Sequence, residues 1–316
     1  VTSDHPEIAA PVIQARNLSI QTTAGQLGSA VFTVIANSFN GGSVSQHFTV
    51  NVSAAPGRAV NLSTRLQVNK GDDVLIGGFI VTGNAPKRVM IRGIGPSLAA
   101  SGVTDALLDP TLELHDRAGA LLRSNDNWHQ FNTDTQATVD TGIAPNDPRE
   151  AVIIATLQPD NYTAIVRGRG DTQGVGLVEV YDLDSGSGAV LANISTRGGV
   201  RTGEGVLIGG FIVAGGDSRN ILARAVGPSL TAAGVNDALA DPALEIHNAQ
   251  GVIVDSNDNW QSSPQAQQIQ ASGVAPSDSK EAATLDLLVP GNYTAVVRGN
   301  GPTPTGTGLV EAYALP

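Results

Sequence analysis

Short runs of β-branched and other apolar residues alternate with polar residues along this chain, and Gly, Asp, Asn or Pro separates the runs at intervals of about ten residues. Alternation with a period of two places successive side chains on opposite faces, so it predicts strands with one buried face. Between residues 58 and 184 the pattern predicts the strands Val60–Val68, Val74–Thr82, Arg88–Ile94, Thr111–His115, Ala120–Ser124, Ala151–Leu157, Tyr162–Arg167 and Gly176–Tyr181.

This series of strands occurs twice. Leu75–Val81 returns unchanged as Leu207–Val213, and Ser124–Trp128 returns as Ser256–Trp260, both after 132 positions (207 − 75 and 256 − 124). A tandem duplication of this kind indicates two copies of one module. Short antiparallel strands in this number predict an all-β fold, with tandem β-sandwiches of jelly-roll or immunoglobulin-like type. We place the sandwiches at residues 58–186 and 187–316.

Short helices interrupt each predicted sandwich. A proline in the first turn and a glycine after the last turn are typical of helix boundaries. Gln265–Ser272, which follows Pro264 and precedes Gly273, has both signals. The matching segment Asp134–Thr141 precedes Gly142, and the other candidates are the turns after Gly95-Pro96 and Gly227-Pro228.

Residues 1–57 lie outside the duplication. Their apolar residues alternate around Leu18, Phe32 and Phe48, and Asn40-Gly41-Gly42 is a hairpin signal. Three or four strands amount to half of an immunoglobulin-like sandwich. Half a sandwich exposes an apolar face and unpaired strand edges, so we expect another segment or molecule to cover it.

Charge and composition restrict the partners. The formal net charge of −11 disfavours nucleic acid and anionic membrane surfaces, which both require clustered Lys and Arg. No apolar run approaches the ~18–20 residues of a membrane-spanning helix. The chain has no cysteine, which excludes disulfides and thiolate metal sites. Because the sequence starts at Val1 without a signal-peptide pattern, we expect a processed product.

The repeated motifs carry a resemblance to a known family. LIGGFIV, RGIGPSL or RAVGPSL, SNDNW and NYTAIVRG or NYTAVVRG resemble a repeat at the C-termini of large exported proteins of verrucomicrobial and related bacteria. The second half of each copy is similar to bacterial pre-peptidase C-terminal domains, apart from a helix inserted after the tryptophan. Leu18–Val52 resembles the closing half of immunoglobulin-like or cadherin-like domains. These resemblances imply a bacterial, extracellular or cell-surface module without catalytic activity.

One polar loop in each copy is a candidate metal site. Asparagine and aspartate supply the oxygen ligands that Ca²⁺ prefers. The alternative is a turn in which these side chains cap backbone N–H groups. The candidate calcium ligands are Asn125, Asp126 and Asn127 in the first copy and Asn257, Asp258 and Asn259 in the second.

The chain has two tryptophans, Trp128 and Trp260, at equivalent positions. An exposed indole beside Asn and Asp could stack on a sugar ring. The alternative is an indole folded under its own loop, covering a strand at Gly77-Gly78 or Gly209-Gly210, where missing side chains leave room.

Charged residues inside otherwise apolar strands predict structural ion pairs, because an unpaired buried charge costs several kcal/mol. We expect Arg167 to pair with Glu179, and Arg298 with Glu311. A second repeated feature is a histidine two residues after a glutamate, at Glu113–His115 and Glu245–His247. Strand alternation places each pair on one face, as an acid–base pair, a metal pair or a surface hydrogen bond.

No catalytic motif is present, so we do not expect an enzyme or a cofactor other than the candidate calcium. An enzyme would need acids such as Glu113 and Asp126 to converge in a cleft. We expect an extracellular structural protein, a subunit of a surface fibre or adhesive stalk. Its copies would join head to tail by strand-edge pairing, through an exposed edge or the segment Glu7–Ile20. The alternative is a carbohydrate-binding or anchoring module pair of a larger secreted protein, with matrix polysaccharide as its partner.

Overall fold

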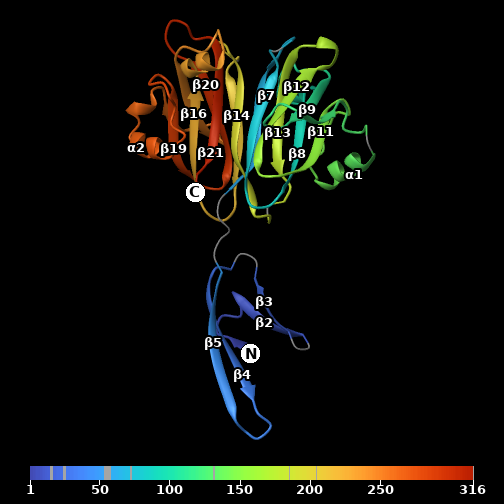
Figure 1. The fold of residues 1–316 in the computed structure, drawn as a ribbon, viewed down its shortest axis with the longest axis vertical. Coiled ribbons are helices and arrows are strands. Elements are labelled where there is room, and N and C mark those ends of the chain that lie inside the picture. Colours follow the sequence, from blue (N-terminus) through green and yellow to red (C-terminus); the bar gives the residue numbers. More distant parts are fainter. Residues whose placement is uncertain are drawn as a thin grey trace. The chain divides into compact units, whose positions relative to one another are not determined.

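The computed structural model describes residues 1–14, 17–23, 26–52, 58–71, 73–130, 132–184, 186–203 and 205–315. The chain divides into two compact units, Val1–Pro56 and Gly57–Pro316. Antiparallel strands make up most of both units (Figure 1), which confirms the all-β prediction. No helix among the described residues is long and apolar enough to cross a membrane.

Every strand predicted for the first copy is present, with ends within two residues of those predicted. The second copy repeats the series. The first copy contains β6 (Arg58–Val68), β7 (Leu75–Gly83), β8 (Lys87–Ile94), β9 (Pro110–His115), β10 (Leu121–Asn125), β11 (Ala151–Leu157), β12 (Asp160–Gly168) and β13 (Gly174–Asp182). The second contains β14 (Ala189–Val200), β15 (Leu207–Ala214), β16 (Arg219–Val226), β17 (Pro242–Asn248), β18 (Ile253–Asn257), β19 (Ala282–Leu288), β20 (Gly291–Gly299) and β21 (Gly306–Ala314).

The two copies share both of their sheets. One eight-stranded sheet has the order β10-β9-β12-β7-β14-β21-β16-β19, and the other has the order β11-β8-β13-β6-β15-β20-β17-β18. Each copy therefore contributes four adjacent strands to each sheet, in the jelly-roll arrangement. The copies join along two antiparallel ladders, β7 with β14 and β6 with β15. Because the sheets run through the junction, the division into two domains at residues 186/187 stays a prediction.

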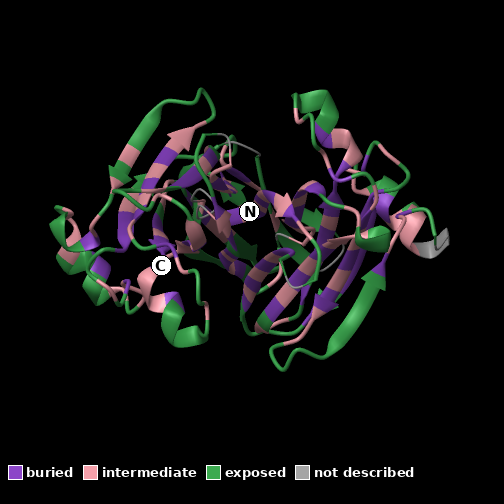
Figure 2. Ribbon diagram, turned by 90° about the horizontal axis from the view of Figure 1, so that it is seen from above, coloured by how far each residue is buried: buried purple, intermediate pink, exposed green. Residues whose placement is uncertain are grey.

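The junction has approximate two-fold symmetry. Ile76 pairs with Arg197 across one ladder, and Ile208 pairs with Arg65 across the other, which is the same pair with the copies exchanged. The hydroxyls of Thr64 and the equivalent Thr196 form a buried hydrogen bond with each other. One hydrophobic core runs through both copies, and buried residues alternate with less buried ones along the strands (Figure 2).

The identical LIGGFIV strands lie at this junction, as β7 and β15. A Cβ at Gly77 would lie 2.9 Å from Val178 Cγ1, and one at Gly209 would lie 3.2 Å from Val310 Cγ1. Glycine thus lets the opposite sheet approach closely at both positions. The sequence predicted that these glycines leave room for the tryptophans, but the valines of the facing sheet occupy that room.

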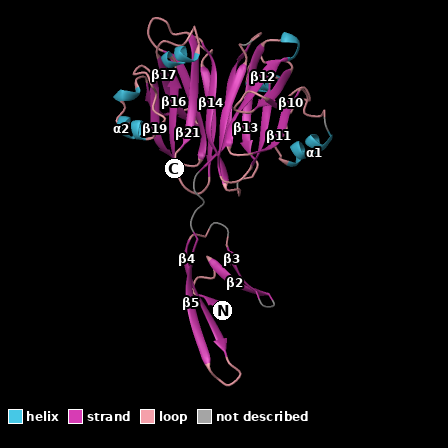
Figure 3. Ribbon diagram, in the orientation of Figure 1, coloured by secondary structure: helices cyan, strands magenta, loops and turns pink. Residues whose placement is uncertain are grey.

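The predicted helices are present and short (Figure 3). Gly102 (φ 85°) ends one of them, and Gly142 (φ 73°) follows another, both in the left-handed region that favours glycine. The helices are η1 (Pro96–Ser101), α1 (Asn132–Asp140), η2 (Arg169–Asp171), η3 (Pro228–Ala233), η4 (Trp260–Ser262) and α2 (Ala266–Ala271).

The N-terminal unit contains two small sheets. One has the order β1 (Thr2–Ser3), β4 (Gly28–Asn37), β5 (Ser43–Val52), and the other pairs β2 (Ala9–Gln14) with β3 (Asn17–Thr22). The hairpin predicted around Asn40-Gly41-Gly42 joins β4 to β5. The fully buried apolar residues of this unit are, among those described, Ala9, Ala30 and Phe32.

Candidate functional site

The charged residues of the strands form one repeated network. The register of β13 and β8 places Glu179 directly opposite Arg92, and Arg92 Nε donates to Glu179 Oε2 at 2.8 Å. In the second copy Arg224 pairs with Glu311 in the same way. Two carboxylates predicted to form structural ion pairs therefore do so.

The prediction that Arg167 and Arg298 are the partners of these carboxylates was wrong. Arg167 lies on β12 and Glu179 on β13, and these strands belong to different sheets. Arg167 Nη1 instead donates to the carbonyl oxygen of Gly71 at 2.8 Å. Arg298 Nε lies 4.0 Å from Glu245 Oε2. Alternation along the chain identifies charged positions in strands but does not tell which strands become neighbours.

A tyrosine completes each network. The Tyr181 hydroxyl donates to Glu179 Oε1 at 3.0 Å and accepts from Arg92 Nη2 at 3.0 Å. Burial, with the nearby Glu179 charge, raises the pKa of Tyr181 to about 12, so the hydroxyl keeps its proton at physiological pH. Burial also raises the pKa of the equivalent Tyr313. A neutral hydroxyl that forms hydrogen bonds with both partners of an ion pair has a structural role.

Both tryptophans are buried, with only 8% of Trp128 and 6% of Trp260 exposed. Trp128 Nε1 donates to the carbonyl of Asp147 at 3.1 Å, and Trp260 Nε1 donates to that of Asp278 at 3.0 Å. Each indole belongs to a small apolar cluster separate from the main core. The first cluster comprises Met90, Trp128, Val152 and Ile154, with Ala137 of α1 packed against it. The alternative of an indole folded under its loop therefore describes both residues, and neither ring face is open to a sugar.

The repeated Asn-Asp-Asn loop supports the neighbouring strand. Asn125 Oδ1 accepts from the backbone N–H of Val152 at 2.9 Å, and its Nδ2 donates to the carbonyl of Asn127 at 3.2 Å. Asn257 makes the same two contacts, with Ala283 and Asn259. These are the contacts of a structural turn.

The aspartates of the two loops have different partners. Asp126 pairs with Arg169 at 2.8 Å, whereas Asp258 accepts from Asn300 Nδ2 at 3.4 Å. Among the described residues, no three His, Cys, Asp or Glu side chains are placed to hold a metal ion. The calcium site stays a prediction, and so does the absence of catalytic activity.

Sequence reasoning missed one repeated site. Glu150 is fully buried, and its Oε1 accepts from the backbone N–H groups of Gly95 at 3.0 Å and Ser97 at 2.9 Å. Glu281 makes the equivalent contacts with Gly227 and Ser229. A carboxylate held by backbone donors fixes the turn before η1 and η3. The signal was available, because Asp-x-x-Glu recurs at residues 147–150 and 278–281.

The predicted Glu–His pairs share a face, as alternation indicated. His115 Nε2 lies 3.0 Å from Glu113 Oε2, and its Nδ1 lies 3.1 Å from the carbonyl of Gly119. His247 repeats this geometry with Glu245 and Gly251. The second ring also borders a hollow of about 470 Å³ with Asn292 and Thr294.

The N-terminal unit has the most exposed apolar surface for its size. Strand β5 ends its sheet, and within the described residues it pairs with β4 alone. Phe48 stacks on the buried Phe32 with ring centroids 5.2 Å apart, so one face of the hairpin is apolar. The exposed large apolar residues of this unit are Ile13, Leu18, Leu27, Val31, Ile35, Phe39, Val44 and Phe48. An unpaired edge beside an apolar face is a surface suited to a further strand.

We expected the segment Glu7–Ile20 to be free to pair with a neighbouring subunit. In the structure it pairs with itself as a hairpin. Most of it lies in β2 and β3, which pair with each other from Ala9↔Thr22 to Gln14↔Asn17. This hairpin uses one edge of each of the two strands. We take the open edge of β5, which lies beside an apolar face, as the candidate surface for strand addition.

Comparisons with known proteins reach only distant structures. No protein-family model matches the chain, and no curated protein matches it. A DUF4785 family protein from Legionella pneumophila subsp. pneumophila str. Philadelphia 1 is similar over 92% of this chain and 65% of its own, at 10% identity and a TM-score of 0.26. The M60 catalytic domain with the CBM51-1 and CBM51-2 domains from Clostridium perfringens ZmpB is similar over 97% of this chain and 45% of its own, at 7% identity and a TM-score of 0.20. The chain thus spans less than two thirds of either structure.

Proposed function

We propose that this protein is an extracellular structural subunit that assembles with further copies of itself by strand-edge pairing. The observation that carries the proposal is the open edge of β5 beside its apolar face. A strand added there would gain main-chain hydrogen bonds and cover alternate apolar side chains. A contact of this type between unlike surfaces continues as an open, head-to-tail filament unless the rotation closes a ring.

A second copy of the chain is the occupant that the structure favours. Within the C-terminal unit, two copies of one module already join by continuing their sheets, through β7 with β14 and β6 with β15. The outer edges of that unit also carry apolar side chains. Leu121 and Leu122 on β10, and their equivalents Ile253 and Val254 on β18, are exposed. We propose that one of these outer edges pairs with β5 of the next subunit.

The extracellular, bacterial cell-surface setting belongs to the same proposal. It is supported by the resemblance of LIGGFIV, SNDNW and NYTAIVRG to modules of large exported bacterial proteins. The buried indoles leave sugar stacking by Trp128 and Trp260 without support, so we do not propose carbohydrate binding at those residues.

The test is electron microscopy and light scattering of the purified chain across a range of concentrations. We expect filaments or concentration-dependent oligomers. Val44, which is 63% exposed, shares the apolar face with Phe48, so Val44→Lys should abolish assembly by placing a charge in the new contact. Ser45→Lys, on the opposite face of the same strand, adds the same charge and is the matched control.

A chain that stays monomeric at the highest soluble concentration would overturn the proposal. Assembly that survives Val44→Lys while Ser45→Lys abolishes it would also overturn it, because the contact would then use the other face. Circular dichroism of both variants checks that the hairpin still folds.

A further inference from the structure

Two hollows lie at the junction of the repeats, at equivalent positions. Each is bordered by the end of a strand of one copy and by the loop that follows η1 or η3. The first, of about 570 Å³, includes Arg65, Gly102, Val103, Asp105 and Val206. The second, of about 420 Å³, includes the residues 132 positions away in the repeat, Arg197, Gly234, Val235, Asp237 and Val74. Both volumes fall in the range of about 300–1,000 Å³ that is typical of small-molecule sites.

The larger hollow contains two arginines whose side chains have no polar partner among the described residues. Arg65 comes from β6 of the first copy, and Arg201 follows β14 of the second copy. Neither guanidinium makes a hydrogen bond or an ion pair with any residue that the structure describes. In a chain with a net charge of −11, two unpaired guanidinium groups at one hollow are a local site for anions.

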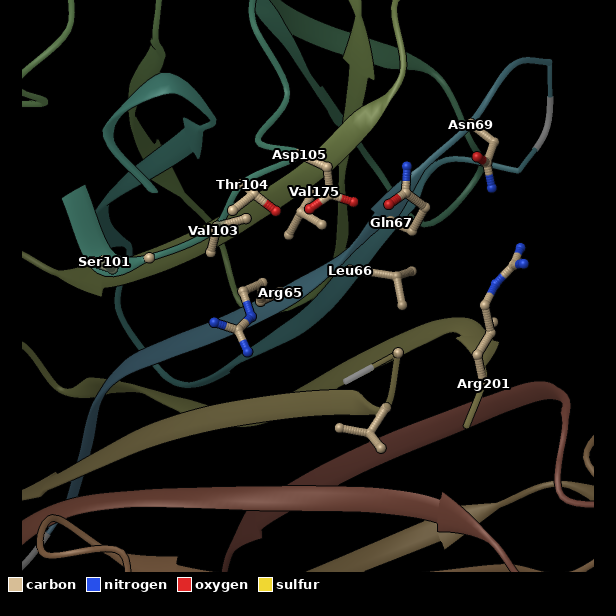
Figure 4. Close-up of a pocket in the computed structure, with 14 residues that line it drawn as sticks. Arg65, Leu66, Gln67, Asn69, Ser101, Val103, Thr104, Asp105, Val175 and Arg201 are labelled. Carbon is tan, nitrogen blue, oxygen red and sulfur yellow. The ribbon is translucent and has the colours of Figure 1, made fainter. Parts of the chain in front are cut away.

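The remaining polar groups of this hollow suit hydroxyl groups. Ser101 and Thr104 supply hydroxyls, and Asn69 supplies an amide whose Nδ2 donates to Asp73 Oδ2 at 2.6 Å. No aromatic side chain of the described residues borders the hollow. Figure 4 shows Arg65 and Arg201 on different segments, with Leu66 between their guanidinium groups in this view. Gln67, with its amide oriented to satisfy both neighbours, donates to Asp105 Oδ2 at 3.3 Å and accepts from the N–H of Gly174 at 3.3 Å.

The smaller hollow differs in charge. Its one arginine, Arg197, shares it with Asp73 and Asp237. Gly199 stands there at the repeat position of Gln67, and it borders both hollows. Counting the described residues only, the repeat provides a matched pair of sites, one with two arginines and one aspartate, the other with one arginine and two aspartates.

We propose that the larger hollow binds a short acidic oligosaccharide such as a dimer of uronic acid. Arg65 and Arg201 each meet a carboxylate, while the amide and hydroxyl side chains meet ring hydroxyls. The smaller hollow repels the same ligand because its aspartates outnumber its arginine. This binding does not depend on strand-edge assembly, and either can fail without the other.

The test is isothermal titration calorimetry of the full chain with digalacturonate, at low and at high salt concentration. Binding should weaken as salt increases, since the carboxylates face charged groups near the surface. Arg65→Gln and Arg201→Gln should each weaken binding by about tenfold or more, the usual effect of losing a charge-assisted hydrogen bond. Arg197→Gln, the same change at the equivalent position, should leave the affinity unchanged.

Gly199→Leu provides a second variant that keeps both arginines. A Cβ at Gly199 would meet no heavy atom within 4 Å, so a leucine can occupy the hollow, and it should block binding without lowering the unfolding temperature. Absence of binding at millimolar digalacturonate would overturn the proposal. Equal affinity for neutral cellobiose, an equal heat signal with sulfate alone, or an equal loss in Arg197→Gln would overturn it as well.

Discussion

The two units of this chain are both built from antiparallel strands, but they bury their apolar residues to different degrees. In the C-terminal unit one hydrophobic core runs through both repeats, and it contains Phe79 and Phe211. In the N-terminal unit, Phe32 is buried with two alanines, while Phe39 and Val44 are exposed. The difference shows that a repeat supplies each module with a strand edge to pair with. Each module meets a partner edge of the other module within the same chain, whereas the outer edge of β5 meets no strand among the described residues.

Core truncation should produce the largest difference between the units. Phe79→Ala removes a fully buried ring and should lower the free energy of unfolding of the C-terminal unit by about 3–5 kcal/mol. Phe32→Ala should leave that transition unchanged. Both tryptophans lie in the C-terminal unit, so guanidinium denaturation followed by indole fluorescence reports on it alone. A shift of the fluorescence transition in Phe32→Ala would show that the two units unfold together.

The outer edge of the second repeat offers a smaller effect that depends on pH. Burial, with the nearby charge of Asp255, raises the pKa of Asp286 from 3.8 to about 6. The folded state therefore binds more protons than the unfolded state between these values, and this contribution to stability is lost as the pH rises through 6. Asp286→Asn should stabilise the protein at pH 7.5 by on the order of 1–3 kcal/mol.

The same substitution should flatten the dependence of stability on pH between about 4 and 6. Denaturant unfolding at pH 4.5 and at pH 7.5 measures both effects, with the exposed Asp217→Asn as the control. The first repeat has Ala155 and Arg123 at the equivalent positions, so its edge carries no such acid pair. An Asp286→Asn protein that is less stable than the parent at pH 7.5 would contradict the prediction.

The repeated tyrosines should show the smallest effect. Tyr181→Phe removes a hydroxyl that bridges Arg92 and Glu179, and it should cost about 1 kcal/mol. Tyr313→Phe should cost the same within about 0.5 kcal/mol, because its network is equivalent. Thermal unfolding of the two variants makes the comparison. Clearly unequal losses would mean that the two repeats support the shared core differently.

The elements of the fold could be predicted well from the sequence, because alternation and turn residues are local signals. Ala151–Leu157 is a strand with the predicted bounds, and the helix after Pro264 is present. The candidate sites were harder to predict. Glu179 was correctly recognised as an ion-pair residue, but Arg92 was missed as its partner because their contact depends on the pairing of β8 with β13. Glu150 was overlooked because its partners lie more than 50 positions away along the chain.

The strands, the short helices and the duplication could be read from the sequence alone. These follow from the period of the side chains and from the turn chemistry of glycine, proline and asparagine. The tertiary structure alone decided that the repeats join edge to edge and where the tryptophans are buried. It also brings Arg65 and Arg201 to the border of one hollow. Backbone hydrogen bonds across a junction use groups that every residue carries, so the choice of neighbouring strands depends on the packing of the whole core.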